Sequence, residues 1–413
     1  MRAALGASRV WYRPERSEGI LNIDDGIIRD LLTFEDERGV LSFYAGHVPS
    51  QAADPQPTAP IELRNQLKAL RSRLEGEDRD LQRAVEKRLS ALDGAVEALL
   101  DPKATGRGRA LFVGVESGEQ REVALHVPFK ERVVFDATAY VRPLVAARDE
   151  GRPATIVVVS RSGARVLRWD TGEASVTAEH DFEPPEELFD GDSTGPSTSN
   201  PQRAMYARSD RDGLTDRIDE HRHRFLRGVL DEVVRSTTAA GIDRLVLSAP
   251  PKLRDEVRGL VHDDDRLRVL MADQAWESDS PAEIATAAWS LLRSVHVDRE
   301  VELVTEVKER ALAGGAGALG MRNVCDALNE GRVAHLLYDD ELTWAGYVSS
   351  EGTLHPRIEG LAADSDLTFE RDPLFIERLV ERAIATSANA TPLGPDEALP
   401  LRVYEGVAAL LRW

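Results

Sequence analysis

Cysteine is almost absent from this sequence of 413 residues, which contains a single one, Cys325. One thiol cannot form an internal disulfide, and it cannot supply the paired thiolates of a cysteine-based zinc site. The sequence also lacks any run of about 18 uncharged apolar residues, so no transmembrane helix is expected. Residues 1–20 lack the apolar core of a secretory signal. Together these absences predict a cytoplasmic protein that does not enter a membrane.

Lysine is scarce as well. Six of the 52 basic residues are lysines, and 72 acidic residues bring the net charge to −20. Such a protein does not attract RNA through its overall field, because the RNA backbone carries charge of the same sign. Any RNA contact must therefore come from local groups of arginines. The acidic excess is large in residues 298–413, which contain 21 acidic and 11 basic side chains.

The length of the chain predicts several domains, because single hydrophobic cores rarely grow beyond about 250–300 residues. Breaks in the residue pattern divide the chain into a flexible leader at 1–20 and three segments at 21–152, 153–297 and 298–413. Both helical and strand patterns occur in each segment. The expected fold class is therefore α/β with three domains.

Residues 21–152 are expected to form an α+β domain with long helices. Between Ile61 and Leu100, leucines and valines recur at spacings of three, four or seven residues. This spacing is typical of a helix with one buried face. Gly76 is expected to interrupt that helical stretch. The other elements expected here are a helix at 24–32 and strands at 40–45, 110–115 and 122–127.

Residues 153–297 have the element order of an RNase-H-like domain. Short apolar runs separated by glycine turns predict a β-meander, with strands at 155–159, 164–170 and 173–180. A polar loop at 183–212 and a helix at 214–239 follow. Strands then alternate with helices, which favours a largely parallel sheet covered on both faces. These later elements are expected at 245–249, 267–272 and 281–295.

Residues 298–413 are expected to form a small α-β-α sandwich. Apolar runs predict strands separated by amphipathic helices. The helices are expected at 298–312, 321–329 and 373–386, and the strands at 333–338, 344–348 and 407–412.

Four stretches of the sequence resemble a known group of proteins. They are Gly39–Tyr44 (GVLSFY), Val157–Val166 (VVVSRSGARV), Asp219–Leu226 (DEHRHRFL) and Gly320–Leu337. In this order they resemble the first strand, the middle-domain hairpin, the helix after the catalytic loop and a third-domain element of the archaeo-eukaryotic release factor and Pelota superfamily. The likeness is greatest to the bacterial members, which include Balon-like hibernation factors.

The resemblance implies a ribosome-binding translation factor that acts in termination, ribosome rescue or hibernation. Its partner would be the ribosome, at the ribosomal RNA and the A-site and P-site tRNA region, and a translational GTPase is left open as a second partner. No cofactor is implied. Release factors of the superfamily cleave peptidyl-tRNA with a Gly-Gly-Gln loop, in which flexible backbone and an uncharged side chain position a water.

The corresponding stretch of this chain contains no Gly-Gly-Gln motif. It reads GPSTSNPQR from Gly195 to Arg203, so Gln202 is the candidate catalytic residue. Pro201 precedes it and has no N–H to offer. Three alternatives remain open. The chain is a factor in which Gln202 positions the hydrolytic water, a catalytically inactive Pelota-like or Balon-like factor, or an acidic protein-interaction module unrelated to the ribosome.

Arginines that follow Gln202 are the candidate RNA contacts. Arg203 and Arg208 lie in a stretch without acidic residues, beside Tyr206, whose ring can stack on a base. Later residues at spacings of four and seven share one face of the expected helix, beside a buried stripe expected at Leu214, Ile218, Phe225, Val229 and Val233. The full set of RNA-contact candidates is Arg203, Tyr206, Arg208, Arg211, Arg217, His221 and Arg224. The competing interpretation is a solvated helix flank.

Three other motifs favour plain structural interpretations. His221 and His223 point about 200° apart on a helix, so they cannot bind one metal ion from one face. The G-x-G-x-x-G pattern at 315–320 follows a helix and not a strand, which predicts a turn between helices and not a dinucleotide site. The acidic triplets at 263–265 and 339–341 are expected at solvated turns. Neither a metal site nor nuclease chemistry is expected.

Overall fold

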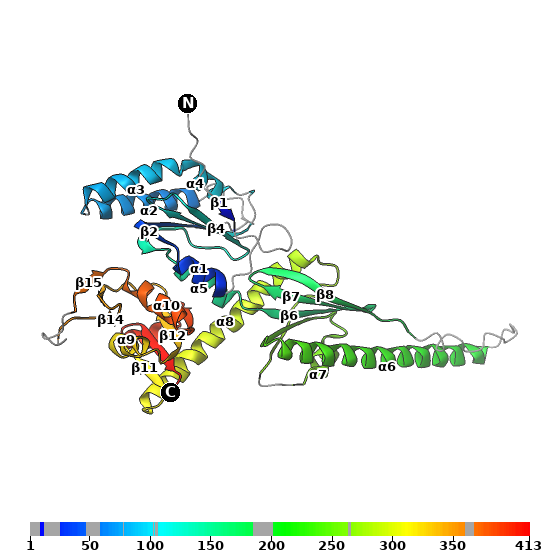
Figure 1. Cartoon of the computed structure of the whole chain (residues 1–413). Coiled ribbons are helices and arrows are strands. Elements are labelled where there is room, and N and C mark those ends of the chain that lie inside the picture. Colours follow the sequence, from blue (N-terminus) through cyan, green and yellow to red (C-terminus); the bar gives the residue numbers. More distant parts are fainter. Residues whose placement is uncertain are drawn as a thin grey trace. The chain divides into compact units, whose positions relative to one another are not determined.

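The computed structural model describes residues 9–11, 25–46, 58–76, 78–101, 103, 106–184, 201–262, 266–359 and 367–413. These residues form a mixed α/β architecture (Figure 1). The chain divides into two compact units, the first from residues 1–152 with 293–413 and the second from 153–292. The division into three domains stays a prediction.

The first part of unit 1 is built on a sheet with the strand order β1-β4-β3-β2-β5. β1 pairs parallel with β4, and the other neighbours are antiparallel. The strands are β1 (Arg9–Trp11), β2 (Glu35–Gly46), β3 (Gly108–Gly114), β4 (Gln120–Leu125) and β5 (Arg132–Thr138). β1 falls within the expected leader, most of which lies outside the described residues. β5 was not expected from the sequence.

Helices in this part follow the predicted apolar spacing. The stretch expected at 61–100 is confirmed, and it is broken near Gly76 into α2 (Thr58–Leu74), α3 (Arg79–Ala91) and α4 (Asp93–Leu100). Asp78 caps α3 by accepting hydrogen bonds from the N–H groups of the first turn. The apolar faces of these helices pack on β2 and β3. Two further helices are α1 (Asp25–Leu32), which was expected, and α5 (Arg142–Glu150), which was not.

The last part of unit 1 contains a sheet in the order β11-β17-β12-β16 and a smaller one in the order β14-β13-β15. The strands are β11 (Gly317–Leu319), β12 (Val333–Asp339), β13 (Gly346–Ser349), β14 (Leu354–His355), β15 (Phe369–Asp372), β16 (Asn389–Leu393) and β17 (Val407–Leu411). The helices are the end of α8 (Pro281–Leu312), α9 (Met321–Asn329), α10 (Phe375–Ala385) and the 3-10 helix η2 (Leu399–Tyr404). The α-β-α layering stays a prediction.

The glycine-rich stretch at 315–320 contains strand β11, so the expectation of a plain turn between helices was wrong. Ala318 pairs with Ala409 of β17. Gly317 lies so close to α8 that a Cβ there would be 2.9 Å from the carbonyl oxygen of Val307. Glycine at this position therefore allows the strand to approach the helix closely.

Unit 2 is built on a sheet with the strand order β10-β9-β6-β7-β8. β6, β9 and β10 run parallel, whereas β6, β7 and β8 form the expected antiparallel meander. The strands are β6 (Ala154–Val159), β7 (Gly163–Asp170), β8 (Glu173–Asp181), β9 (Arg244–Ser248) and β10 (Arg268–Met271). The RNase-H-like assignment stays a prediction.

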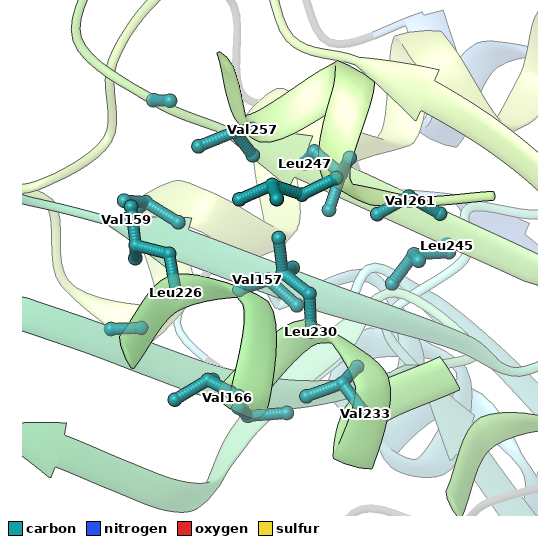
Figure 2. Packing of buried hydrophobic residues seen from close by; sticks show 14 of the residues in the cluster. Val157, Val159, Val166, Leu226, Leu230, Val233, Leu245, Leu247, Val257 and Val261 are labelled. Atoms are coloured by element: carbon teal, nitrogen blue, oxygen red, sulfur yellow. The ribbon is translucent and has the colours of Figure 1, made fainter. Parts of the chain in front are cut away.

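Both faces of this sheet are covered, as its sequence predicted. Val157 and Val159 of β6 pack against α6 (Pro201–Ala239) and α7 (Arg254–Leu260) (Figure 2). The alternate residues Ile156 and Val158 pack on the other face against the start of α8. Burial on both faces explains why β6 is a continuous run of apolar residues and not an alternating one.

Two helices are longer than expected. α6 begins at Pro201, so residues 201–212 are helical and not part of a polar loop. Proline suits the first position of a helix, because its fixed φ matches and its missing N–H is not needed there. α8 is continuous where helices at 281–295 and 298–312 were expected, and no glycine or proline interrupts it after Pro281. In the part of the chain described, no helix has the length and apolar character of a membrane span.

Candidate nucleic-acid interface on helix α6

Helix α6 is anchored to the sheet of unit 2 by one apolar face. Leu226, Val229, Leu230 and Val233 are buried at spacings of three and four residues, which places them on one side of the helix. The predicted stripe is only partly correct. Val229 and Val233 belong to it, and Phe225 is half-buried and packs against the same core, with its ring centroid 5.4 Å from that of Phe182. Sequence spacing alone missed Leu226 and Leu230.

The candidate contacts of the later helix lie outside this buried face. Arg217 and Arg224 are exposed, and His221 is half-buried. Arg224 Nη2 lies 3.7 Å from Glu220 Oε1, and both side chains are largely in solvent. Exposed pairs of this kind contribute little to stability, so the arginine can exchange this carboxylate for a phosphate. The structure therefore leaves the cationic ends of Arg217 and Arg224 accessible.

A second set of polar residues fastens α6 to α7. The His223 Nδ1 atom lies 2.8 Å from Glu256 Oε1, and its Nε2 atom lies 3.2 Å from Arg227 Nη2. Arg222 forms an ion pair with Asp219 one turn earlier. Both ring nitrogens of His223 thus contact protein groups. Within the described residues, no group of three or more His, Cys, Asp or Glu side chains is placed to hold a metal ion.

Five of the candidates lie in the first part of α6. The backbone there is helical, and the side chains of residues 201–215, like residues 185–200 before them, lie outside the described residues. Gln202 is therefore a helix residue and not a loop residue, which corrects the expectation. The candidates concerned are Gln202, Arg203, Tyr206, Arg208 and Arg211.

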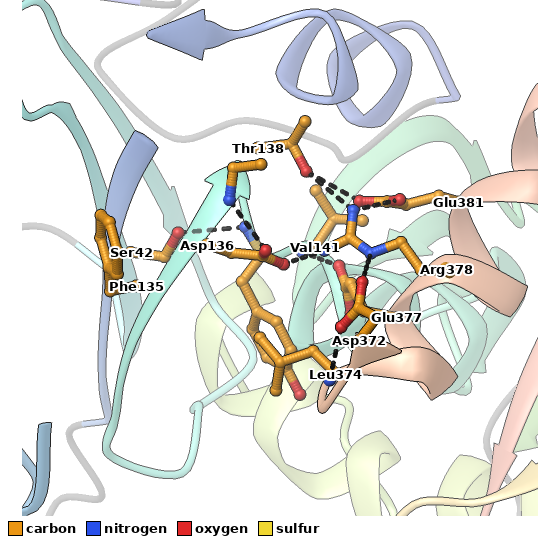
Figure 3. A network of polar contacts seen from close by, with 12 residues as sticks. Ser42, Phe135, Asp136, Thr138, Val141, Asp372, Leu374, Glu377, Arg378 and Glu381 are labelled. Atoms are coloured by element: carbon orange, nitrogen blue, oxygen red, sulfur yellow. Dashed lines mark hydrogen bonds and ion pairs between the residues drawn. The ribbon is translucent and has the colours of Figure 1, made fainter. Parts of the chain in front are cut away.

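A buried ionic cluster in unit 1 was missed by the sequence reasoning (Figure 3). Arg378 of α10 forms ion pairs with Asp136, with Asp372 at 2.9 Å and with Glu381 at 2.6 Å. The hydroxyl of Thr138 donates a 2.8 Å hydrogen bond to Glu381 Oε1. Burial raises the pKa of Asp136 and that of Glu381. These partners come from segments more than 200 residues apart, so no local sequence pattern marks them.

A cavity of about 390 Å³ in unit 1 was missed as well. Its wall includes Glu300 and His296 of α8, whose Oε1 and Nε2 atoms are 3.5 Å apart. Burial, followed by the charges of neighbouring carboxylates, raises the pKa of Glu300 to about 8. In the sequence only a histidine and an acid four residues apart, His296 and Glu300, hint at it, and many exposed helices share that pattern.

The middle of the chain matches the model of a known protein family. Residues 140–290 match a family model described as bacterial archaeo-eukaryotic release factor family 10. The match includes the whole sheet of unit 2 and helices α5, α6 and α7. Over these residues the chain is thus similar to bacterial members of the archaeo-eukaryotic release factor and Pelota superfamily, which confirms the resemblance predicted from the sequence.

Several similar solved structures belong to archaeal proteins. The archaeal translation termination factor aRF1 is 16% identical, with 94% of this chain and 96% of that chain covered, at a TM-score of 0.23. Pelota in a model of ribosome-bound archaeal Pelota and ABCE1 is 12% identical, with 94% of each chain covered, at a TM-score of 0.41. Archaeoglobus fulgidus Pelota is 15% identical, with 74% of this chain and 79% of that chain covered, at a TM-score of 0.34. A search of curated proteins finds no match. Since these TM-scores are low, the family assignment rests on residues 140–290.

Proposed function

We propose that this protein is a ribosome-associated translation factor that binds near the A site and acts by occupancy and not by cleavage of peptidyl-tRNA. The observation that supports it is the family match over residues 140–290. Within that stretch, α6 carries the candidate RNA contacts. Rescue of stalled ribosomes and hibernation are the roles that such a factor would serve. A translational GTPase remains an open second partner.

The charge of the protein determines how it would contact RNA. With a net charge of −20, general attraction to the ribosome is absent. Binding would depend on exposed arginines such as Arg217 and Arg224, together with Arg203 and Arg208 earlier in α6. Each phosphate contact adds about 0.9 to the slope of log affinity against log salt. We therefore expect ribosome binding with a salt dependence set by a few local contacts.

Two features argue against hydrolysis. The sequence has no Gly-Gly-Gln motif, and Gln202 follows Pro201 at the beginning of α6. Positioning water against an ester requires a backbone that can approach closely, which glycines supply and a helical proline does not. A hydrolytic factor in which Gln202 acts remains the alternative, and release assays separate the two.

Co-sedimentation of the purified protein with ribosomes tests this proposal. We expect the wild type in the ribosome fraction at low salt, and at least a tenfold loss of affinity in Arg217→Glu/Arg224→Glu. Arg310→Glu/Arg322→Glu is the matched control, since it changes the net charge equally at exposed positions in unit 1. Absence of the wild type from ribosome fractions of growing and stressed cells would favour an acidic interaction module instead.

A further inference from the structure

The cavity in unit 1 has an acidic end and an apolar wall. Glu150 of α5, Glu300 of α8 and Glu397 of the segment after β16 supply the acids. Val297 and Leu393 belong to the apolar lining. A volume of about 390 Å³ lies within the range of small-molecule sites. The cavity is therefore large enough for a small ligand with one charged end.

Glu300 is the most deeply buried of these three acids. Its residue is 4% exposed. His296 Nε2 is 3.5 Å from Oε1, and within the described residues no lysine or arginine pairs with this carboxylate. The adjacent Arg299 pairs with Asp149 at 3.1 Å instead. A buried carboxylate without a cation is unfavourable, because burial removes its hydration. The cavity leaves space beside Glu300 for a cation, and a bound cation would compensate its buried carboxylate.

The other two acids have distinct surroundings. Glu150 lies 3.6 Å from Arg293, so it is partly compensated. The Glu397 carboxylate occupies the space that a side chain at residue 394 would need, which the glycine at that position leaves free. Gly394 and Glu397 both line the cavity. The chain between Gly394 and Glu397 is therefore shaped so that the Glu397 carboxylate lies against the backbone of Gly394 at the cavity wall.

The electrostatics around Glu300 are dominated by like charge. Burial is the main cause that raises its pKa to about 8, together with the carboxylates of Glu397, Asp149 and Glu150 and against the opposing charge of Arg299. Near neutral pH these surroundings therefore keep this acid protonated, and a bound cation would displace the proton. The other charged or titratable groups of the cavity wall are Lys130, Arg132, Tyr140, Arg142, Arg293, His296, Asp340 and Glu341.

We propose that this cavity binds a small aliphatic amine, with its ammonium group at the acidic end beside Glu300 and Glu397 and its carbon chain on the apolar wall. An organic cation fits better than a metal ion, since no group of three ligating side chains is assembled among the described residues. The proposal does not depend on ribosome binding, so each of the two can fail without the other.

Isothermal titration of the whole protein with n-butylamine at constant ionic strength tests it. We expect one saturable site, and release of up to one proton, seen as a difference in heat between two buffers of different ionisation enthalpy. Glu300→Gln keeps the shape but removes the charge, and it should weaken binding at least tenfold. Glu309→Gln, on the exposed side of the same helix, is the matched control and should bind as the wild type does.

In the titrations with n-butylamine, three results would overturn the proposal. They are the absence of saturable binding by the wild type, equal affinity of Glu300→Gln, and equal losses in Glu300→Gln and Glu309→Gln. A capped lysine, Nα-acetyl-lysine methylamide, distinguishes the source of the ammonium group. Binding of this compound without binding of n-butylamine would assign the cavity to a protein side chain and refute the small amine. If Glu300→Gln fails to fold, Glu397→Gln repeats the test, and unchanged affinity there refutes the site.

Discussion

The backbone N–H of Val141 donates a 2.7 Å hydrogen bond to Oε1 of Glu377, a residue 236 positions further along the chain. Glu377 lies on α10 and is 1% exposed, and its second oxygen, Oε2, has no hydrogen-bond partner within the described residues. Burial, followed by the charge of Glu381, raises the pKa of this carboxyl to about 8. At neutral pH Glu377 therefore binds the N–H of Val141 mainly as an uncharged acid.

Glu377→Gln should accordingly change stability little at pH 7, because an amide oxygen accepts the same hydrogen bond. Glu377→Ala should lower the free energy of unfolding by about 2–4 kcal/mol, since it leaves a cavity and an unpaired buried N–H. Urea denaturation followed by circular dichroism measures both. Equal losses in the two variants would show that the bond to Val141 does not hold the segment.

The same acid predicts how stability depends on pH. A glutamate in the unfolded chain has a pKa of about 4.3, below the value near 8 in the folded protein. Between these values the folded state binds a proton that the unfolded state has released, so the free energy of unfolding falls as pH rises through this window. Glu300 contributes in the same direction. Urea midpoints from about pH 5 to 8 should decline less steeply in Glu377→Gln than in the wild type. Parallel curves would contradict the assignment.

Arg378 should be the most sensitive position of the ionic cluster. Its guanidinium compensates Asp136, Asp372 and Glu381, all of them largely buried. Arg378→Met should cost about 3–5 kcal/mol, because it leaves carboxylates buried without a cation. The matched control is Arg83→Met, which removes an arginine from an exposed pair with Asp80 and should cost less than about 1 kcal/mol. Denaturation midpoints of the two variants decide this, and similar losses would refute a special role for Arg378.

Elements with strong local patterns were predictable from the sequence, and elements defined by distant partners were not. The leucine spacing of α2 to α4 and the apolar run of β6 marked their positions within a few residues. β11 was not predictable, because a strand of three residues in a glycine-rich stretch depends on its pairing with β17. The start of α6 was misplaced because polar residues near Pro201 resemble a loop in composition.

The candidate site was predictable only as a set of charges on a helix. Spacing placed Arg217, His221 and Arg224 near one another, but the exact rotation of α6 came from its packing on β6 and β7. Glu300 and Glu397 could not be paired from sequence, since the fold alone brings α8 beside the segment after β16. Contacts between residues far apart in the sequence produce no periodic pattern, so residue spacing cannot reveal them.

Release assays on stalled ribosomes distinguish occupancy from catalysis. We expect no cleavage of peptidyl-tRNA by the wild type, because Gln202 lies in a helix after a proline. Gln202→Ala should therefore leave both ribosome binding and release unchanged, whereas Arg203→Glu/Arg208→Glu should reduce binding. Cleavage by the wild type that is lost in Gln202→Ala would establish the hydrolytic alternative and refute the proposal of action by occupancy.

Two glycines should respond in opposite directions to a methyl group. Gly346 of β13 lies so close to the ring of buried Phe375 that a Cβ would overlap it, whereas a Cβ at Gly228 of α6 meets nothing within 4 Å. Gly346→Ala should cost about 1–3 kcal/mol through overpacking. Gly228→Ala should raise the free energy of unfolding by up to about 1 kcal/mol, since alanine favours the helix. Thermal and urea unfolding measure both changes. Stabilisation by Gly346→Ala would show that Phe375 can move aside, and destabilisation by Gly228→Ala would show that the outer face of α6 is packed against another part of the protein.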